Sequence, residues 1–104
     1  MIQFEVGIIA LTHRELEEVF TLIADAYPGA TAYKSSSGHA IRFPMVNIAF
    51  LLVGRSRGYR FDAIYYSDDI SEIQMKEIIH PMIPFAARSH IRPISELRQE
   101  LTNI

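Results

Sequence analysis

The apolar segment at residues 2–10 constrains the fold of this chain more than any other feature. Its length and the β-branched residues Val6, Ile8 and Ile9 favour a strand that is buried on both faces. A second stretch, Met45–Val53, is also apolar on both faces and predicts another such strand. Strands of this kind need covering layers, so the order of elements predicts an α/β or α+β fold.

A helix should follow the first strand directly. Thr12 and Glu15 stand at the spacing of a capping box, and Pro28-Gly29 marks the helix end. Between these signals, one apolar stripe at helical spacing is made by Leu16, Val19, Phe20, Ile23 and Tyr27. The next signal is a hairpin, with strands at 30–34 and 39–43 around a turn of serines and Gly38.

The second half of the chain predicts a strand at 59–66 and a helix at 70–79, the helix opened by Asp69 and Glu72 as a second capping box. The buried side of that helix is expected to hold Ile70, Ile73 and Ile78, with Met75 and Ile79 as further candidates. Prolines 81 and 84 end it. A short strand at 85–88 and a helix at 94–101 complete a mixed sheet of five to six strands with two to three helices, in one domain over residues 1–104.

Composition narrows the class of protein. The chain has 104 residues, 49% of them hydrophobic and 21% charged, which is the balance of a soluble globular domain. It has no cysteine, which excludes disulfides, thiol nucleophiles and cysteine-ligated metals. The N-terminal residues lack the pattern of a signal peptide, and the longest uncharged run, 43–54, is too short to span a bilayer. We expect a cytoplasmic protein without membrane contact.

The charges are segregated along the chain. No acidic residue lies between Asp25 and Asp62, although that stretch holds six basic residues: Lys34, His39, Arg42, Arg55, Arg57 and Arg60. Arginine suits bidentate contact with phosphate or carboxylate. Arg55, Arg57 and Arg60 are therefore the candidate nucleic-acid or phosphate contacts, with Tyr59 and Phe61 as possible stacking groups. The alternative is that these arginines pair with Asp62, Asp68 or the carboxylates of a neighbouring molecule.

Asp68 and Asp69 follow an apolar strand, where carboxylates can bind Mg²⁺. The alternative, which we favour, is that Asp69 caps the next helix and Asp68 lies at the positive end of its dipole. Asp62 is expected inside a strand, paired with Arg60 or Arg42. The four histidines show no zinc-ligand spacing, so we predict no metal site and no cofactor.

Three segments, in this order and spacing, resemble the ATPase core of phage terminase large subunits and related helicase-like P-loop proteins. The strand–Thr-x-Arg–helix segment of that family resembles VGIIALTHRELEEVF, residues 6–20. Its S-x-G-x-x-I-x-F hairpin region is similar to SSSGHAIRFPMVNIAFL, residues 35–51. Its G-x-x-R-G-x-R-x-D-x-I-x-x-D-E segment, which ends in the Walker B acidic pair, resembles GRSRGYRFDAIYYSDDI, residues 54–70. The resemblance covers residues 6–81 and implies a phage or prophage origin.

The departures from that family bear on function. The sequence contains no G-x-x-x-x-G-K-[ST] loop, which P-loop ATPases need to hold phosphates. Leu11 replaces the family's proline, and the basic position is shared between His13 and Arg14. The Walker B pair falls on Ser67 and Asp68 in one register, and on Asp68 and Asp69 in another. The resemblance therefore implies a remnant of an ATPase core with a vestigial acidic pair.

These observations favour a non-catalytic binding protein on a truncated terminase-like ATPase fold, in contact with nucleic acid or a protein partner. One alternative is a metal-dependent enzyme that acts on phosphate substrates with Asp62, Asp68 and Asp69. Another is a protein–protein inhibitor or scaffold whose acidic helix, residues 15–25, faces a basic partner. Because few helices are available to cover the sheet, one face or edge should be under-covered, and we expect a homo-oligomer.

Overall fold

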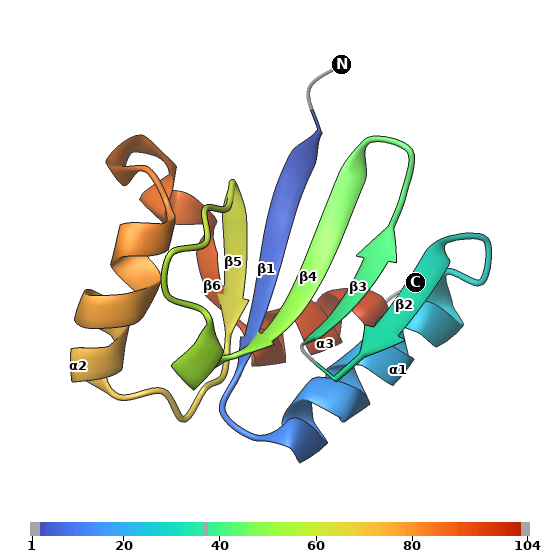
Figure 1. Ribbon diagram of the computed structural model, residues 1–104, viewed down its shortest axis with the longest axis horizontal. Coiled ribbons are helices and arrows are strands. Elements are labelled where there is room, and N and C mark those ends of the chain that lie inside the picture. Colours follow the sequence, from blue (N-terminus) through green and yellow to red (C-terminus); the bar gives the residue numbers. More distant parts are fainter. Residues whose placement is uncertain (1–2, 37, 103–104) are drawn as a thin grey trace.

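The computed structural model describes residues 3–36 and 38–102, and it confirms the predicted α/β fold with a single mixed sheet (Figure 1). Ile2 of the first predicted strand and Ser37 of the predicted turn lie outside the described residues. The strands are β1 (Phe4–Ala10), β2 (Thr31–Ser35), β3 (Gly38–Arg42), β4 (Val46–Leu52), β5 (Ala63–Tyr66) and β6 (Ile91–Pro93). The α-helices are α1 (His13–Ala26), α2 (Glu72–Gln74) and α3 (Ile94–Thr102).

The six strands lie in the order β2-β3-β4-β1-β5-β6. β1 is parallel to both of its neighbours, β4 and β5, and β6 is parallel to β5. β2, β3 and β4 form an antiparallel meander at the other side. The strands predicted at 2–10 and 59–66 are therefore parallel neighbours, an arrangement that open α/β sheets in general share.

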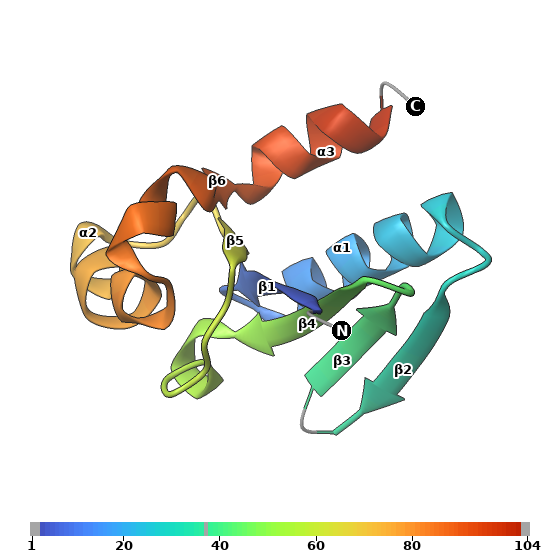
Figure 2. The same ribbon diagram turned by 90° about the horizontal axis from the view of Figure 1, so that it is seen from above.

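The two faces of the sheet are covered differently. Figure 2 shows α1 and α3 on the same side of the sheet, and they pack on the core that contains Ile8, Ile41 and Phe50. On the opposite side, the segment from α2 to residue 83 covers β5 and β1, and its core contains Ile9, Ile64 and Ile79. Within the described residues, no helix covers β2, β3 and β4 on that second side, which we call the open face. The prediction of an under-covered face is met there.

The starts of α1 and α2 are both capped by side chains close in sequence, and the cap of α2 corrects a prediction. Thr12 caps α1: its Oγ1 accepts a hydrogen bond from the Glu15 N–H at 3.2 Å, as predicted. The capping box at α2 is not Asp69 with Glu72. It is Ser71 with Gln74, in which each side chain accepts from the backbone N–H of the other.

The segment predicted as one helix over 70–79 is less regular than expected. Only 72–74 is α-helical, Met75–Ile79 is π-helical, and His80–Met82 forms a 3-10 turn. The wider π-turn rotates the later side chains relative to an α-helical stripe. The prediction that Ile73 is buried is wrong, since its side chain lies before the π-turn and is 68% exposed, whereas Ile78 and Ile79 are buried.

Two strand predictions also need correction. Residues 85–88 are not a strand but part of a 3-10 helix, Phe85–His90, and the short strand β6 follows it. The strand predicted at 59–66 begins only at Ala63. Residues 59–61 lead to that strand without belonging to it, and this segment positions the candidate site. No helix in the described part of the chain is both long and apolar enough to cross a membrane.

Candidate functional site

The candidate site is built on the segment that leads from β4 to β5. After the 3-10 turn Val53–Arg55, the chain runs back alongside β5 to the start of that strand (Figure 1). Its first turn is closed by the buried Ser56, whose hydroxyl donates to the Val53 carbonyl at 2.9 Å. Its far end is held by two backbone bonds of 2.8 Å, from Phe61 N to Met82 O and from Asp62 N to Glu5 O. We call residues 53–62 the crossing segment.

Phe61 and Tyr59 stack in parallel on the crossing segment. Their ring centroids lie 5.9 Å apart and their planes differ by 5°. Phe61 is buried and packs directly on Gly7 of β1, where an added Cβ would come within 2.7 Å of the ring. Because Gly7 has no side chain, the Phe61 ring can pack directly against the strand. Tyr59 is 46% exposed, so it offers an aromatic surface to solvent from a fixed base.

The alanines of the open face form a flat floor beside this stack. The strand register places Tyr33, Ala40, Ala49 and Gly7 in one row across β2, β3, β4 and β1. Both alanines are half-buried, and Tyr33 at the end of the row is exposed. The row therefore carries exposed tyrosine at β2 and the Tyr59–Phe61 stack over β1, with small side chains between them.

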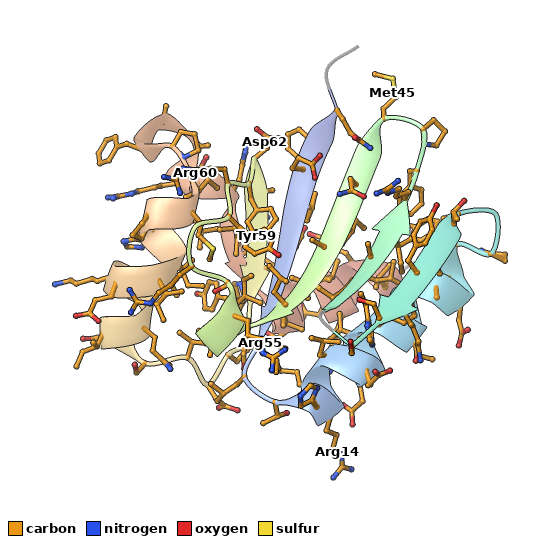
Figure 3. The ribbon with its side chains drawn as sticks, viewed as in Figure 1. Arg14, Met45, Arg55, Tyr59, Arg60 and Asp62 are labelled. Carbon is orange, nitrogen blue, oxygen red and sulfur yellow. The ribbon has the colours of Figure 1, made fainter. Side chains whose placement is uncertain are left out.

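The predicted arginines lie along a line rather than in one cluster. Figure 3 shows Arg55 near the end of β4 and Arg60 at the opposite end of the crossing segment, with Tyr59 between them. Arg55, Arg57 and Arg60 are all exposed, and Arg60 donates to the Tyr59 carbonyl at 3.1 Å. Arg42 lies over the Tyr33 ring, 5.1 Å from its centroid.

These arginines are not neutralised within the part of the chain that the structure describes. The ion pairs among described residues involve other cations: Arg14, Lys34, His39, Arg92 and Arg98. Among the residues that the structure describes, the alternative of pairing with Asp62 or Asp68 is therefore not realised. Asp62 instead accepts a 2.8 Å bond from the Glu5 N–H, and Asp68 accepts a 3.1 Å bond from Ser95 N at the start of α3.

The three aspartates of the enzyme alternative do not converge. Asp62 immediately precedes β5 and Asp68 follows shortly after its end, so a four-residue strand of roughly 13 Å separates them. Asp69 lines a shallow pocket of about 360 Å³ at the carboxyl ends of β1 and β5, together with Arg14 and Arg98. Among the described residues, no group of three or more His, Asp or Glu side chains could hold a metal ion.

The acidic face of α1 is partly engaged inside the molecule. Glu17 accepts bonds from His39 at 2.6 Å and Lys34 at 3.1 Å, and Glu18 lies 3.2 Å from Arg14 and 3.6 Å from Arg98. The hydrogen bond from His39, followed by that from Lys34, holds the pKa of Glu17 below its ordinary value. These pairs connect α1 to the hairpin and to α3. Fewer carboxylates of α1 are therefore left to bind a basic partner.

Sequence reasoning found the arginines and Tyr59 but missed the floor. Tyr33, Ala40 and Ala49 meet only through the register of three strands, and no local motif marks them. One signal was available in the sequence, because Arg42 belongs to the same acid-free stretch as the other arginines. Comparisons of this chain with protein-family models, with curated proteins and with solved structures found no match.

Proposed function

We propose that this chain is a non-catalytic binding protein that holds single-stranded nucleic acid on its open face. The observation that carries the proposal is the Tyr59–Phe61 stack, fixed on Gly7 and flanked along the crossing segment by Arg55, Arg57 and Arg60. Proteins that bind single strands combine aromatic side chains for the bases with cations that follow the phosphates. With this function we retain a terminase-like origin as a proposal, supported by the three sequence segments.

The division of roles follows from geometry. Tyr59 stands on a buried ring and loses little freedom when a base stacks on it, and such stacking contributes about 1–3 kcal/mol per base. The arginines have no intramolecular carboxylate to give up among the described residues, so contact with phosphate costs no internal ion pair. Because the face is exposed and continuous, it suits an extended strand of nucleic acid better than a small substrate that a pocket must enclose.

The test is fluorescence anisotropy of a labelled oligothymidine at about 50 mM salt, where phosphate contacts are strong. Tyr59→Ala should weaken binding by about 5- to 150-fold, the loss of one stacked base, whereas Tyr59→Phe should retain it. Arg55→Ala and Arg57→Ala should each reduce the slope of log affinity against log salt by about 0.7.

Arg14→Ala is the matched control, because it removes one arginine from the helix side of the molecule (Figure 3). It should leave both affinity and salt slope close to those of the wild type. The proposal fails if no binding is seen at low salt, or if Arg14→Ala weakens binding as much as Arg55→Ala does. An equal loss of affinity in Tyr59→Phe and Tyr59→Ala would contradict the proposal that the Tyr59 ring stacks on a base.

A further inference from the structure

A second surface, at the amino ends of β1 and β4, carries exposed apolar side chains that the proposed function does not use. The turn from β3 to β4 contains Phe43, Pro44 and Met45, and Met45 is 56% exposed. Phe4 N donates to the Met45 carbonyl at 3.0 Å, so the start of β1 is joined to this turn. Figure 3 shows Met45 projecting beyond the ends of the strands.

Beside this turn lies an apolar groove of about 670 Å³ between α1, α3 and β4. Its wall residues are almost all hydrophobic, with Ile23 and Leu101 on the helices, Tyr27 directly after α1 and Met45 on the turn before β4. Glu100 is its charged residue and accepts a long bond, 3.4 Å, from the Tyr65 hydroxyl. We call the groove, the turn and the flanking side chains the amino-end surface.

The amino-end surface has charges of opposite sign on its two flanks. Tyr27 and Phe43 pack edge to face, with centroids 5.4 Å apart, and form a ridge. The groove with Glu100 lies on one side of the ridge, and a second pocket of about 690 Å³, lined by Arg42, lies on the other. Both charged side chains are exposed, and Arg42 has no carboxylate partner among the described residues.

We propose that the amino-end surface binds a second copy of this chain in a two-fold symmetric dimer. In such an interface, when one residue of the first copy contacts a second residue of the other copy, the reverse contact also forms. One surface must therefore carry both partners of every contact. This surface does so: it presents a projecting methionine beside an apolar groove, and an arginine flank opposite a glutamate flank. A two-fold axis along the ridge places the Arg42 flank of each copy against the Glu100 flank of the other, so that Arg42 pairs with Glu100 twice and the partner copy covers the groove with Met45.

The physical gain of this dimer is burial of side chains that are exposed in the monomer. Three of the large exposed hydrophobic residues belong to this end of the molecule: Phe4, Tyr27 and Met45. Soluble monomers rarely expose contiguous apolar patches of more than a few hundred Å², and larger ones mark interaction sites. Contact between the two copies removes both the apolar groove and Met45 from water.

Sedimentation equilibrium of the full chain, without nucleic acid, tests the dimer over low to high micromolar loading. The wild type should show a concentration-dependent dimer, and Met45→Glu should raise its dissociation constant at least about tenfold. Phe85→Glu is the matched control: Phe85 is 80% exposed but lies outside the amino-end surface, and this variant should dimerise as the wild type does.

A charge exchange separates this dimer from other modes of association. Arg42→Glu and Glu100→Arg should each weaken the dimer because like charges then face each other, and the double variant should recover wild-type association. A wild type that stays monomeric at every loading overturns the proposal. A dimer that the charge variants do not affect also overturns it, because that result would point to pairing through the β2 edge. A monomer that binds an apolar small molecule in the groove overturns it as well. Tyr59→Ala should leave the dimer intact, so a failure of the nucleic-acid proposal is seen separately.

Discussion

At the scale of single residues, Gly7 shows how one missing side chain shapes the candidate site. It sits in the middle of β1 beneath the Phe61 ring, where a Cβ would lie 2.7 Å from two ring carbons. Gly7→Ala should destabilise the protein by about 1–3 kcal/mol, because overpacking in a filled core forces displacement of the ring or strand. Urea denaturation measures the loss.

Gly54→Ala is the control, since nothing lies within 4 Å of a Cβ there. Its effect should stay within about 0.5 kcal/mol. If the contact with Phe61 is the cause, Gly7→Ala should cost much less when Phe61 is replaced by alanine. Equal costs in both backgrounds would place the strain elsewhere in β1.

At the scale of secondary-structure elements, the start of α2 shows which of several polar residues caps a helix. Ser71 accepts the Gln74 N–H at 3.2 Å, whereas Asp69 lies two residues earlier, and its own N–H donates to Ser67 Oγ. Ser71→Ala should therefore cost about 1 kcal/mol, the usual loss for an N-cap. Asp69→Ala should change stability by less than about 0.5 kcal/mol, as an exposed substitution does. Thermal unfolding of both variants checks this, and the reverse order would contradict the assignment.

The link between α1 and the hairpin predicts a dependence on pH. The pKa of Glu17 is lowered in the folded protein, first by the bond from His39 and then by that from Lys34. The unfolded chain binds the proton more readily, so this stabilisation is present above pH 4.5 and is lost as the pH falls toward the folded-state pKa. Glu17→Gln should flatten the acid limb of a stability–pH profile.

Glu77→Gln controls for the change in net charge in that experiment, because Glu77 is exposed and lies outside the hairpin contact. It should keep the acid limb of the wild type. Denaturation midpoints between pH about 5 and about 3 would decide the matter. An acid limb that is equally steep in wild type and Glu17→Gln would show that this contact does not couple folding to protons.

At the scale of the whole molecule, two cores share one sheet. Ile8 and Ile9 are adjacent on β1 but belong to opposite cores, one under α1 and α3 and the other under residues 78–83. We therefore expect a single cooperative unfolding transition. Ile41→Val and Ile79→Val, one in each core, should each cost about 0.5–1.5 kcal/mol and shift the same transition. Circular dichroism and tyrosine fluorescence, recorded at one protein concentration, should remain coincident; separate transitions would contradict the expectation.

The sequence alone determined the features that depend on near neighbours along the chain. The apolar segments predict β1 and β4, and the cap at Thr12 with the stripe from Leu16 predicts α1, since each signal lies within a few residues of the structure that it specifies. The line of exposed arginines on the crossing segment was also readable, because exposure follows from charge and from the flanking glycines.

The tertiary structure decided everything that depends on which strands are neighbours. Residues 59–62 alternate like a strand, but Phe61 N bonds to Met82 rather than to a neighbouring strand, and contact with β1 begins only where Asp62 N bonds to Glu5. Asp68 accepts a hydrogen bond from the start of α3 because β6 brings Ser95 beside it. The floor of alanines beside Tyr59 exists only in the sheet order β3-β4-β1, because side chains far apart in sequence share a row only when the register brings them there.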